Sequence, residues 1–349
     1  MIKVLKYSLF PFSILYWIIT YTRNLLFDIA FLKSTKCDIP IISVGNITVG
    51  GTGKTPHVQY IINLLQNYVA LASLSRGYKR STKGFVLATS STTVNEIGDE
   101  PYLLHKRFPE ISVAVCEDRV GGVQKIMCNT PSKLVVLDDA FQHRKIACNL
   151  QIVLVDYNRP LWKDYVFPVG FLREGAYAIK RAQVVIVTKC PALTIAEQNY
   201  WRKNLCITKQ ILFFTKIAYG SLYDSKTKVA YNNTEILQNA SILLVSGIAQ
   251  SEPLLSYISS FNTSVQHCNF SDHHAYTSQD ITEIYHTYLQ LHTNSKTIIV
   301  TTEKDIYKLS QLQDYKIPIF VLPIVPEFID NTQATFNELL LDVISKKSV

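Results

Sequence analysis

The chain has 349 residues, of which 48% are hydrophobic and 18% are charged, and its formal net charge is +8. The length favours two domains, the hydrophobic share excludes an intrinsically disordered protein, and the lack of any run of about 20 uncharged apolar residues excludes a multi-span membrane protein. The positive charge favours anionic partners, namely phosphorylated small molecules, nucleic acid or an acidic membrane surface.

The N-terminal segment, residues 1–36, differs from the rest of the chain. An uncharged apolar run extends from Tyr7 to Thr22, with lysine or arginine on both sides. The run is short for a membrane-spanning helix, and no small-residue cleavage site of a secretory signal peptide follows it. A helix lying in the membrane interface fits better, with Tyr7, Tyr16, Trp17 and Tyr21 at headgroup level. A helix packed in the core of a soluble domain is the alternative.

From residue 38 onward, short aliphatic runs alternate with polar stretches of helical length. Continuous rather than alternating hydrophobicity indicates strands that are buried on both faces, as in a parallel sheet with crossover helices. The runs are 40–44, 69–74, 111–115, 133–137, 151–155 and 183–187. An open sheet of this kind binds ligands at the carboxyl ends of its strands. The polar residues that follow the runs are therefore expected to converge on one site: Asn46, Arg76, Asp118, Arg119, Asp138, Asp139, Asp156 and Lys189.

The second half of the chain changes character. Residues 207–240 are typical of one or two antiparallel strands with a polar turn at 224–226, and aliphatic runs at 242–245, 297–300 and 317–322 then alternate with helical stretches near 278–291 and 333–346. We therefore predict four parts: an N-terminal membrane-associating segment (1–36), a larger α/β domain (37–206), a β connector (207–240) and a smaller C-terminal α/β domain (241–349).

A glycine-rich turn follows the first aliphatic run and leads into Gly53-Lys54-Thr55 and a helix-like segment. In such a loop the backbone N–H groups surround phosphates, the lysine supplies charge to the β- and γ-phosphates, and the threonine offers its hydroxyl to Mg²⁺. The usual pattern G-x-x-x-x-G-K-[ST] has glycine where this chain has Thr48. An accidental Gly-Lys-Thr is the alternative interpretation. We predict that the nucleotide contacts Thr48, Val49, Gly50, Gly51, Thr52, Gly53, Lys54 and Thr55.

A second element of a nucleotide site follows the run 133–137, which ends in Asp138 and Asp139. Two carboxylates after a buried strand resemble the element that completes the Mg²⁺ shell in P-loop proteins, although a solvated turn is the alternative. The pattern does not say which aspartate binds the metal directly. Neither 188–191 nor 302–305 matches the guanine-reading motif [NT]-K-x-D, so ATP is the expected nucleotide. The fold class that follows is α/β, with a P-loop NTPase-like parallel sheet and a second, smaller α/β domain.

Six motifs occur in chain order. They are SVGNITVGGTGKTP (43–56), SRGY (75–78), GDEP (98–101), DDAFQHR (138–144), PVGFLRE (168–174) and FSDH (270–273). Together they resemble the motifs of the tetraacyldisaccharide 4′-kinase family, the lipid A 4′-kinases of Gram-negative bacteria, over nearly the whole chain. That family's loop reads Thr-Val-Gly-Gly-x-Gly-Lys-Thr, which accounts for Thr48.

The resemblance implies a reaction and a location. The γ-phosphate of ATP would pass, with Mg²⁺, to the 4′-hydroxyl of an acylated glucosamine disaccharide 1-phosphate, giving lipid IVA in lipid A biosynthesis. The enzyme would lie at the cytoplasmic face of the inner membrane, held peripherally or by a single N-terminal helix. A membrane-recruited P-loop ATPase switch without a lipid acceptor is the alternative function. Nucleic acid is not expected as a partner because lysine and arginine are dispersed, and the seven cysteines contain no Cys-x-x-Cys pair, as is typical of the reduced cytosol.

The resemblance also implies roles for individual residues. Asp99 and His273 would form a pair that takes the proton of the acceptor hydroxyl; from the residues alone, the adjacent His274 is an equal candidate. Lys54 and Asp139 would be further catalytic residues, and the metal ligands would be Thr55, Asp138 and Asp139. Candidate substrate-binding residues are Arg76, Arg119, Gln142, His143, Arg173 and Glu174. For the arginines the alternative is a surface ion pair, and for His143 it is a helix cap.

Overall fold

The computed structural model describes residues 2–261, 264–292 and 296–345, and for residues 2–7, 310 and 313 it describes the backbone only. The predicted interfacial position of the Tyr7 side chain therefore lies outside the described part. The chain divides into two compact units. Unit 1 comprises Met1–Ile217 and Pro326–Val349, and unit 2 comprises Ala218–Val325.

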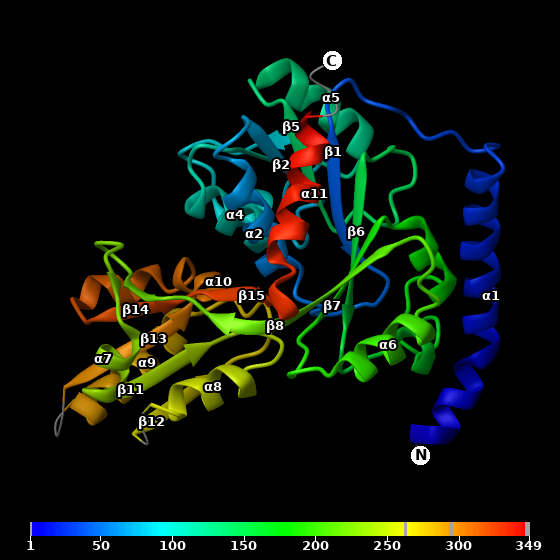
Figure 1. Cartoon of the computed structure of the whole chain (residues 1–349). Coiled ribbons are helices and arrows are strands. Elements are labelled where there is room, and N and C mark those ends of the chain that lie inside the picture. The colour runs from blue at the N-terminus through cyan, green and yellow to red at the C-terminus, as the bar shows by residue number, and fades with distance from the viewer. Residues whose placement is uncertain (1, 262–263, 293–295, 346–349) are drawn as a thin grey trace. The chain divides into compact units, whose positions relative to one another are not determined.

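Unit 1 is built on a nine-stranded sheet in the order β15-β8-β7-β6-β1-β5-β2-β4-β3 (Figure 1). In this order, neighbouring strands from β8 through to β4 are parallel, and the edge strand β3 is antiparallel to β4. The strands are β1 (Ile41–Asn46), β2 (Leu71–Ser75), β3 (Val86–Leu87), β4 (Ser112–Val115), β5 (Leu134–Asp138), β6 (Leu150–Asp156), β7 (Val184–Thr188), β8 (Ile211–Tyr219) and β15 (Ile324–Phe328). The central strands β1, β5 and β7 are buried along their whole length, as the continuous aliphatic runs predict.

Helices cover both faces of this sheet. On one face α2 (Lys54–Leu65), α4 (Asp99–Arg107) and α11 (Gln333–Ser345) bury apolar side chains, and α3 (Val94–Ile97) precedes α4. On the other face lie α5 (Arg119–Asn129), α6 (Ile195–Asn204) and the segment 161–182. The last helix of the chain thus packs beside the helix that follows the phosphate loop.

Unit 2 has its own six-stranded sheet in the order β10-β9-β14-β13-β11-β12. Its strands are β9 (Leu222–Asp224), β10 (Ala230–Tyr231), β11 (Ser241–Ser246), β12 (Val265–Asn269), β13 (Thr297–Thr302) and β14 (Ile319–Leu322). Strands β11, β12, β13 and β14 are parallel to one another, and β9 and β10 form an antiparallel edge. Helices α7 (Asn233–Gln238), α8 (Glu252–Ser259), α9 (Ser278–His292) and α10 (Glu303–Ile306) connect them.

The predicted fold class is confirmed, and each of the six predicted strands between residues 40 and 187 is present and parallel. The prediction for 207–240 was partly wrong. β9 and β10 are the expected antiparallel pair, but β8 is parallel to β7 and extends the large sheet. The division into units also places residues 326–349 with the larger unit, whereas the sequence-based boundaries placed them in the smaller domain.

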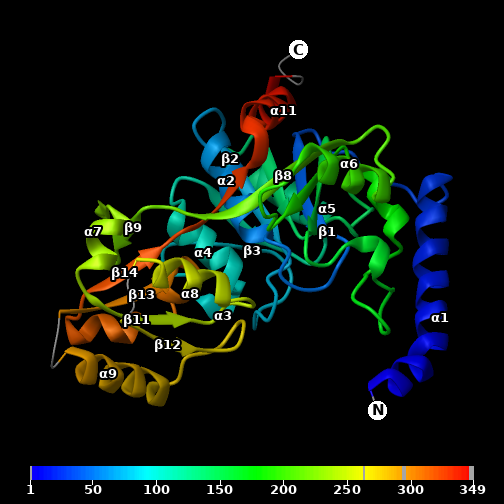
Figure 2. The same cartoon turned by 60° about the horizontal axis from the view of Figure 1, so that its bottom comes forward.

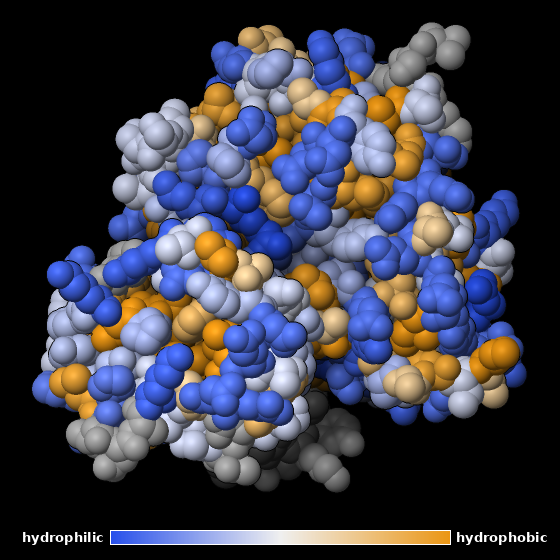
Figure 3. Space-filling view, turned by 60° about the vertical axis from the view of Figure 1, so that its left-hand side comes forward, coloured by the Kyte–Doolittle hydropathy of each residue, from blue (hydrophilic) through white to orange (hydrophobic). Residues whose placement is uncertain are grey.

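The N-terminal helix α1 (Ile2–Asp28) runs along one side of unit 1 (Figures 1 and 2). Its polar side chains face the protein: Ser13 donates to the Val166 carbonyl, and Tyr16 donates to the Arg173 carbonyl at 3.0 Å. Most of its large apolar side chains face outward, for example Phe12 at 62% and Ile19 at 57% exposure, whereas Phe27 is 9% exposed. On the face shown in Figure 3, by comparison, hydrophobic residues stand in separate groups between hydrophilic ones.

None of the helices in the described residues is long and apolar enough to cross a membrane.

Candidate active site

The phosphate loop joins β1 to α2 and is held by side chains that bind its backbone carbonyls. Every carbonyl oxygen from residue 49 to residue 53 accepts such a hydrogen bond. The donors are Arg159 to Val49 (3.2 Å), Asn46 to Gly50 (3.5 Å), Lys189 to Gly51 (2.6 Å), Thr188 to Thr52 (2.9 Å) and His57 to Gly53 (2.7 Å).

This arrangement determines which way the loop's amide groups point. In a trans peptide the N–H of one residue points opposite to the carbonyl of the residue before it. Because the carbonyls are held against the protein, the N–H groups of residues 50–54 turn the other way, as an anion-binding loop requires. Gly50 and Gly53 have φ of +103° and +83°, values that residues with a side chain rarely adopt. A Cβ atom at Gly50 would also lie 3.0 Å from the Arg159 guanidinium.

His57 is unusually buried for a residue that can carry a charge, since it is only 5% exposed. Burial lowers its pKa to about 4, so the ring is neutral at pH 7. The Gly53 carbonyl can only accept, so Nδ1 carries the proton, and Nε2 accepts from the Thr215 hydroxyl at 3.1 Å. His57 thereby connects the phosphate loop to strand β8.

The two aspartates at the end of β5 have different surroundings. Asp138 is 3% exposed and its Oδ1 has no hydrogen-bond partner within the protein. Burial, together with the nearby Glu100 carboxylate, raises the pKa of Asp138 to about 7, although Lys54 opposes this. Burial alone would also raise the pKa of Asp139, but Lys54 and Arg173 outweigh it and hold that pKa below its usual value. Arg173 donates to both oxygens of Asp139, at 2.8 and 3.0 Å, and Lys54 lies 3.8 Å away.

Arg119 follows β4 and is 2% exposed. It donates to the Cys116 carbonyl, but its Nε and Nη2 have no hydrogen-bond partner. Burial lowers the pKa of Arg119, and the nearby carboxylates of Asp138 and Asp139 act in the opposite direction. A buried guanidinium with unpaired N–H groups is suited to bind an anion.

The donor set at this point also fits a magnesium ion. Thr55 donates to Glu100 at 3.1 Å, and the Glu100 carboxylate is close enough to help raise the pKa of Asp138, whose Oδ1 has no hydrogen-bond partner. Magnesium usually takes one or two protein carboxylates and completes its shell with water and phosphate oxygens. Among the described residues, no group of three or more His, Cys, Asp or Glu side chains has the geometry to hold a metal alone.

The remaining predicted substrate residues of unit 1 fall into two groups. Arg76 is exposed, and His143 is half-buried. Burial lowers the pKa of His143 to about 4, and the positive charges of Arg119 and Arg76 contribute to this decrease. Gln142 and Glu174, in contrast, bond to each other at 3.0 Å, and Glu174 is 2% exposed. The carboxylate of Glu174 is therefore occupied by contacts within the protein.

The predicted catalytic pair is divided between the units: Asp99 is the first residue of α4 in unit 1, and His273 follows β12 in unit 2. Lys304 lies 2.5 Å from Asp272 and 3.3 Å from Nε2 of His273, so Lys304 donates to the ring and Nε2 accepts. The neighbouring His274 bonds to Asp280 at 3.0 Å and packs between aromatic rings. These contacts give His274 a structural role and leave His273 as the better candidate.

A family comparison can now be set beside this geometry. Residues 5–345 match the family model described as tetraacyldisaccharide-1-P 4′-kinase. The chain belongs to this family. A tetraacyldisaccharide 4′-kinase of Phocaeicola vulgatus is 42% identical, with 100% of this chain and 97% of the relative covered, and one of Flavobacterium psychrophilum is 39% identical, with 99% and 98% covered. A crystal structure of LpxK from Aquifex aeolicus in complex with ATP superposes with a TM-score of 0.76 at 30% identity, covering 97% of this chain and 99% of that one.

Within this kinase family fold, the sequence did not reveal the residues that hold the phosphate loop. Asn46 and Lys189 stood out as polar residues after strands, but the pattern predicted contact with a ligand rather than with the loop's carbonyls. His57 and Arg159 gave no signal, because a single histidine in a helix or arginine in a loop is usually unremarkable. The predicted roles of Asp99, His273 and the substrate residues stay predictions.

Proposed function

We propose that this chain transfers the γ-phosphate of ATP to the 4′-hydroxyl of a tetraacyldisaccharide 1-phosphate, giving lipid IVA. The observation that carries the proposal is the phosphate loop with its held carbonyls, beside the buried, unpaired groups of Asp138 and Arg119, in a member of this kinase family. Phosphoryl transfer depends mainly on positioning and charge neutralisation, and these are what the loop and its neighbours supply.

The loop N–H groups and Lys54 would bind the phosphates of ATP, and Arg119 would add a buried positive charge. Thr55 and Asp138 would hold Mg²⁺, and Glu100 would orient its water ligands. Held there, Mg²⁺ would neutralise negative charge on the phosphates. Asp139 is placed differently: it keeps Lys54 and Arg173 in position through ion pairs. We therefore assign direct metal binding to Asp138.

Asp99 and His273 would take the proton from the 4′-hydroxyl as its oxygen bonds to the γ-phosphorus and the bond to the β,γ-bridging oxygen breaks, leaving ADP. Lys304, which donates to Nε2 of His273, would fix the ring orientation. Single and double substitutions of Asp99 and His273 test the pair, since losses that multiply fully would argue against joint action.

The location we propose is the cytoplasmic face of the inner membrane, with α1 in the interface. The support is the reversed polarity of α1: polar side chains of this helix bind the rest of unit 1, while most of its large apolar side chains face outward. An outward apolar face has no stabilising role in water, but it fits the headgroup and acyl boundary of a lipid layer. The acylated acceptor would be reached from the same layer.

The test uses the purified chain with [γ-³²P]ATP, Mg²⁺ and detergent-dispersed tetraacyldisaccharide 1-phosphate, followed by thin-layer chromatography. We expect labelled lipid from the wild type and none from Lys54→Ala. Free phosphate released at the same rate with and without lipid, and no labelled lipid, would favour the membrane-recruited ATPase switch instead.

A further inference from the structure

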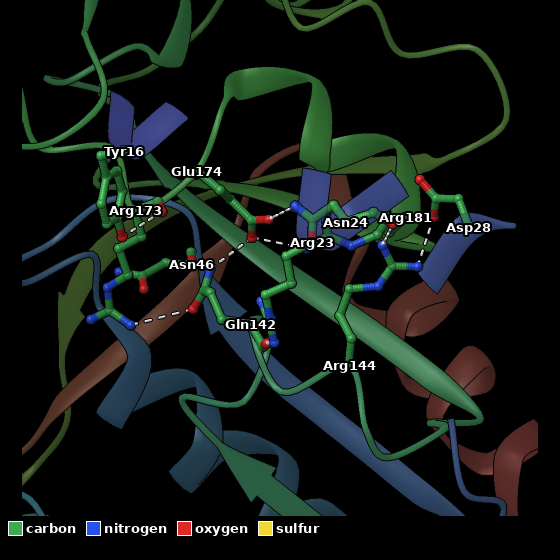
Figure 4. Close-up of polar contacts among 10 residues, drawn as sticks. All are labelled: Tyr16, Arg23, Asn24, Asp28, Asn46, Gln142, Arg144, Arg173, Glu174 and Arg181. Atoms are coloured by element: carbon green, nitrogen blue, oxygen red, sulfur yellow. Dashed lines mark hydrogen bonds and ion pairs between the residues drawn. The ribbon is translucent and has the colours of Figure 1, made fainter. Parts of the chain in front are cut away.

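A network of polar contacts joins α1 to the segments that carry the site (Figure 4). Its centre is the carboxylate of Glu174, which accepts from Asn24 of α1 at 2.7 Å, from Gln142 at 3.0 Å and from Arg181 at 2.8 Å. Asn24 and Glu174 are each 2% exposed, so the contact between them is shielded from water. A buried carboxylate with three donors is firmly held, and losing one donor leaves part of its charge without compensation.

The network continues from Glu174 to the phosphate loop. Nε2 of Gln142 also donates to the Asn46 carbonyl at 2.9 Å, at the last residue of β1. The side chain of Asn46 in turn donates to the Thr52 hydroxyl at 2.8 Å. Three consecutive side chains therefore connect Asn24 on α1 with the loop that binds phosphate.

α1 also contacts the backbone on both sides of the Asp139–Arg173 ion pair. Arg23 donates to the Gln142 carbonyl at 2.7 Å, and Tyr16 donates to the Arg173 carbonyl at 3.0 Å. A shift of α1 would thus reach the two segments that hold this ion pair, as well as the phosphate loop.

We propose that α1 aligns the catalytic site through its inward polar face. In this role Glu174 is a positioning residue rather than a substrate ligand. It couples Asn24 to Gln142 and, through Gln142, to the phosphate loop. This inference rests on the proposed function for its main assay. It separates two roles of α1: contact with lipid through the outward apolar face, and alignment of the site through the inward polar face.

The two roles make different predictions for the kinetics. A helix that only contacts the lipid would change the KM for the acceptor, whereas a helix that aligns the site would change kcat. Misplacing catalytic groups through a remote substitution can cost up to about a hundredfold in rate, so we expect a loss of about tenfold for a single broken link.

The experiment compares Asn24→Leu, which removes the donor but keeps the volume, with Glu174→Gln, the double variant and Asp28→Ala. Asp28 is the matched control because it also binds α1 to unit 1, through Arg144 at 2.7 Å, without touching Glu174. Measured quantities are kcat and the KM for the lipid acceptor, the dissociation constant of ATP and the melting temperature of each variant.

We expect Asn24→Leu and Glu174→Gln each to lower kcat about tenfold, to leave the KM for the lipid within about twofold and to weaken ATP binding about threefold or more. The double variant should lose no more than Glu174→Gln alone, and Asp28→Ala should match the wild type. An unchanged kcat in Asn24→Leu, or a change confined to the KM for the lipid, would overturn the proposal, as would losses that multiply in the double variant.

The failure of the proposed function gives a different result. In that case the wild type itself labels no lipid, and the coupling is then read from the dissociation constant of ATP, which needs no acceptor. Equal ATP affinity in the wild type, Asn24→Leu and Asp28→Ala would overturn the inference in that case as well. If Glu174→Gln fails to fold, Asn24→Leu and its control still decide the matter.

Discussion

His57 allows a direct test of whether held carbonyls prepare the phosphate loop for ATP. Its two ring nitrogens make two separate contacts, Nδ1 to the Gly53 carbonyl and Nε2 to Thr215. An asparagine amide nitrogen can take the place of Nδ1, and a glutamine amide the place of Nε2. His57→Asn should therefore keep the contact with the loop, and His57→Gln should keep only the contact with β8.

The magnitude follows from the buried contact that is lost. In His57→Gln the Gly53 carbonyl keeps only the 3.4 Å contact with the main-chain N–H of residue 57, and loss of the side-chain donor costs about 1–3 kcal/mol. If all of that cost falls on the loop conformation that binds ATP, the affinity of His57→Gln falls roughly five- to 140-fold, at about 1.4 kcal/mol per factor of ten. His57→Asn should stay within about threefold of the wild type, because it keeps the loop contact.

The assay is equilibrium binding of ATP to the three proteins at pH 7.5, with melting temperatures recorded in parallel. His57→Ala, which has no polar side-chain atom, provides the reference for loss of both contacts. Equal ATP affinity in the Asn and Gln variants would refute the reasoning, since the loop would then be indifferent to the Gly53 contact. So would wild-type affinity in His57→Ala.

The same residue predicts a pH dependence of stability. The pKa of His57 is about 4 in the folded protein against an ordinary value of 6.5, so between these values the unfolded chain binds the extra proton. Stability from this group is complete above about pH 6.5 and is lost as the pH falls towards 4. The shift of about 2.5 pH units corresponds to about 3 kcal/mol. The advantage of the wild type over His57→Asn in the free energy of unfolding should shrink by that amount between pH 7 and pH 4.

Three further substitutions test other contacts of the site. Asp138→Asn should abolish lipid phosphorylation. It should also gain about 3 kcal/mol in unfolding free energy relative to the wild type between pH 4 and pH 7, because the folded Asp138 keeps its proton up to about pH 7 whereas the unfolded chain loses it near pH 4; parallel pH profiles in denaturant titrations would contradict this. Lys189→Met should lower the free energy of unfolding by about 3 kcal/mol, since it leaves the 1% exposed Asp156 without its 2.7 Å partner, and an unchanged melting curve would speak against it. Lys304→Met should lower kcat with little change in the KM for ATP, whereas an effect on that KM alone would show that Lys304 does not act through His273.

The large sheet could be predicted from the sequence because its strands are buried on both faces and therefore read as continuous aliphatic runs. β8 departs from this pattern, since its first residue and Lys216 are exposed, and it was assigned together with the rest of 207–240 to an antiparallel connector. The membership of α11 could not be predicted, because its apolar face fits either unit. Phe336 and Leu340 pack with the residues of α2, which only the folded structure reveals.

At the site, the sequence identified the groups that meet a ligand but not those that hold them. Glycines, a lysine and paired aspartates at fixed spacing carry their own chemical signature. A contact such as Lys189 to the Gly51 carbonyl joins residues that lie far apart in the chain, and no local pattern encodes it. For the same reason no local pattern revealed that the Glu174 carboxylate accepts from Asn24 of α1, from Gln142 in the loop after β5 and from Arg181.

The assembly of unit 1 from both ends of the chain bears on how the enzyme is made. Helix α2 buries its apolar face beneath Phe328 and α11, and Tyr60 of α2 donates to Asn337 at 2.7 Å. These residues follow unit 2 in the chain, so all of unit 2 is synthesised before them. The helix behind the phosphate loop therefore waits, partly uncovered, until the ribosome has passed unit 2. A chain that stops at residue 325 would leave the apolar face of α2 without Phe328 and α11, and we expect such a fragment to aggregate.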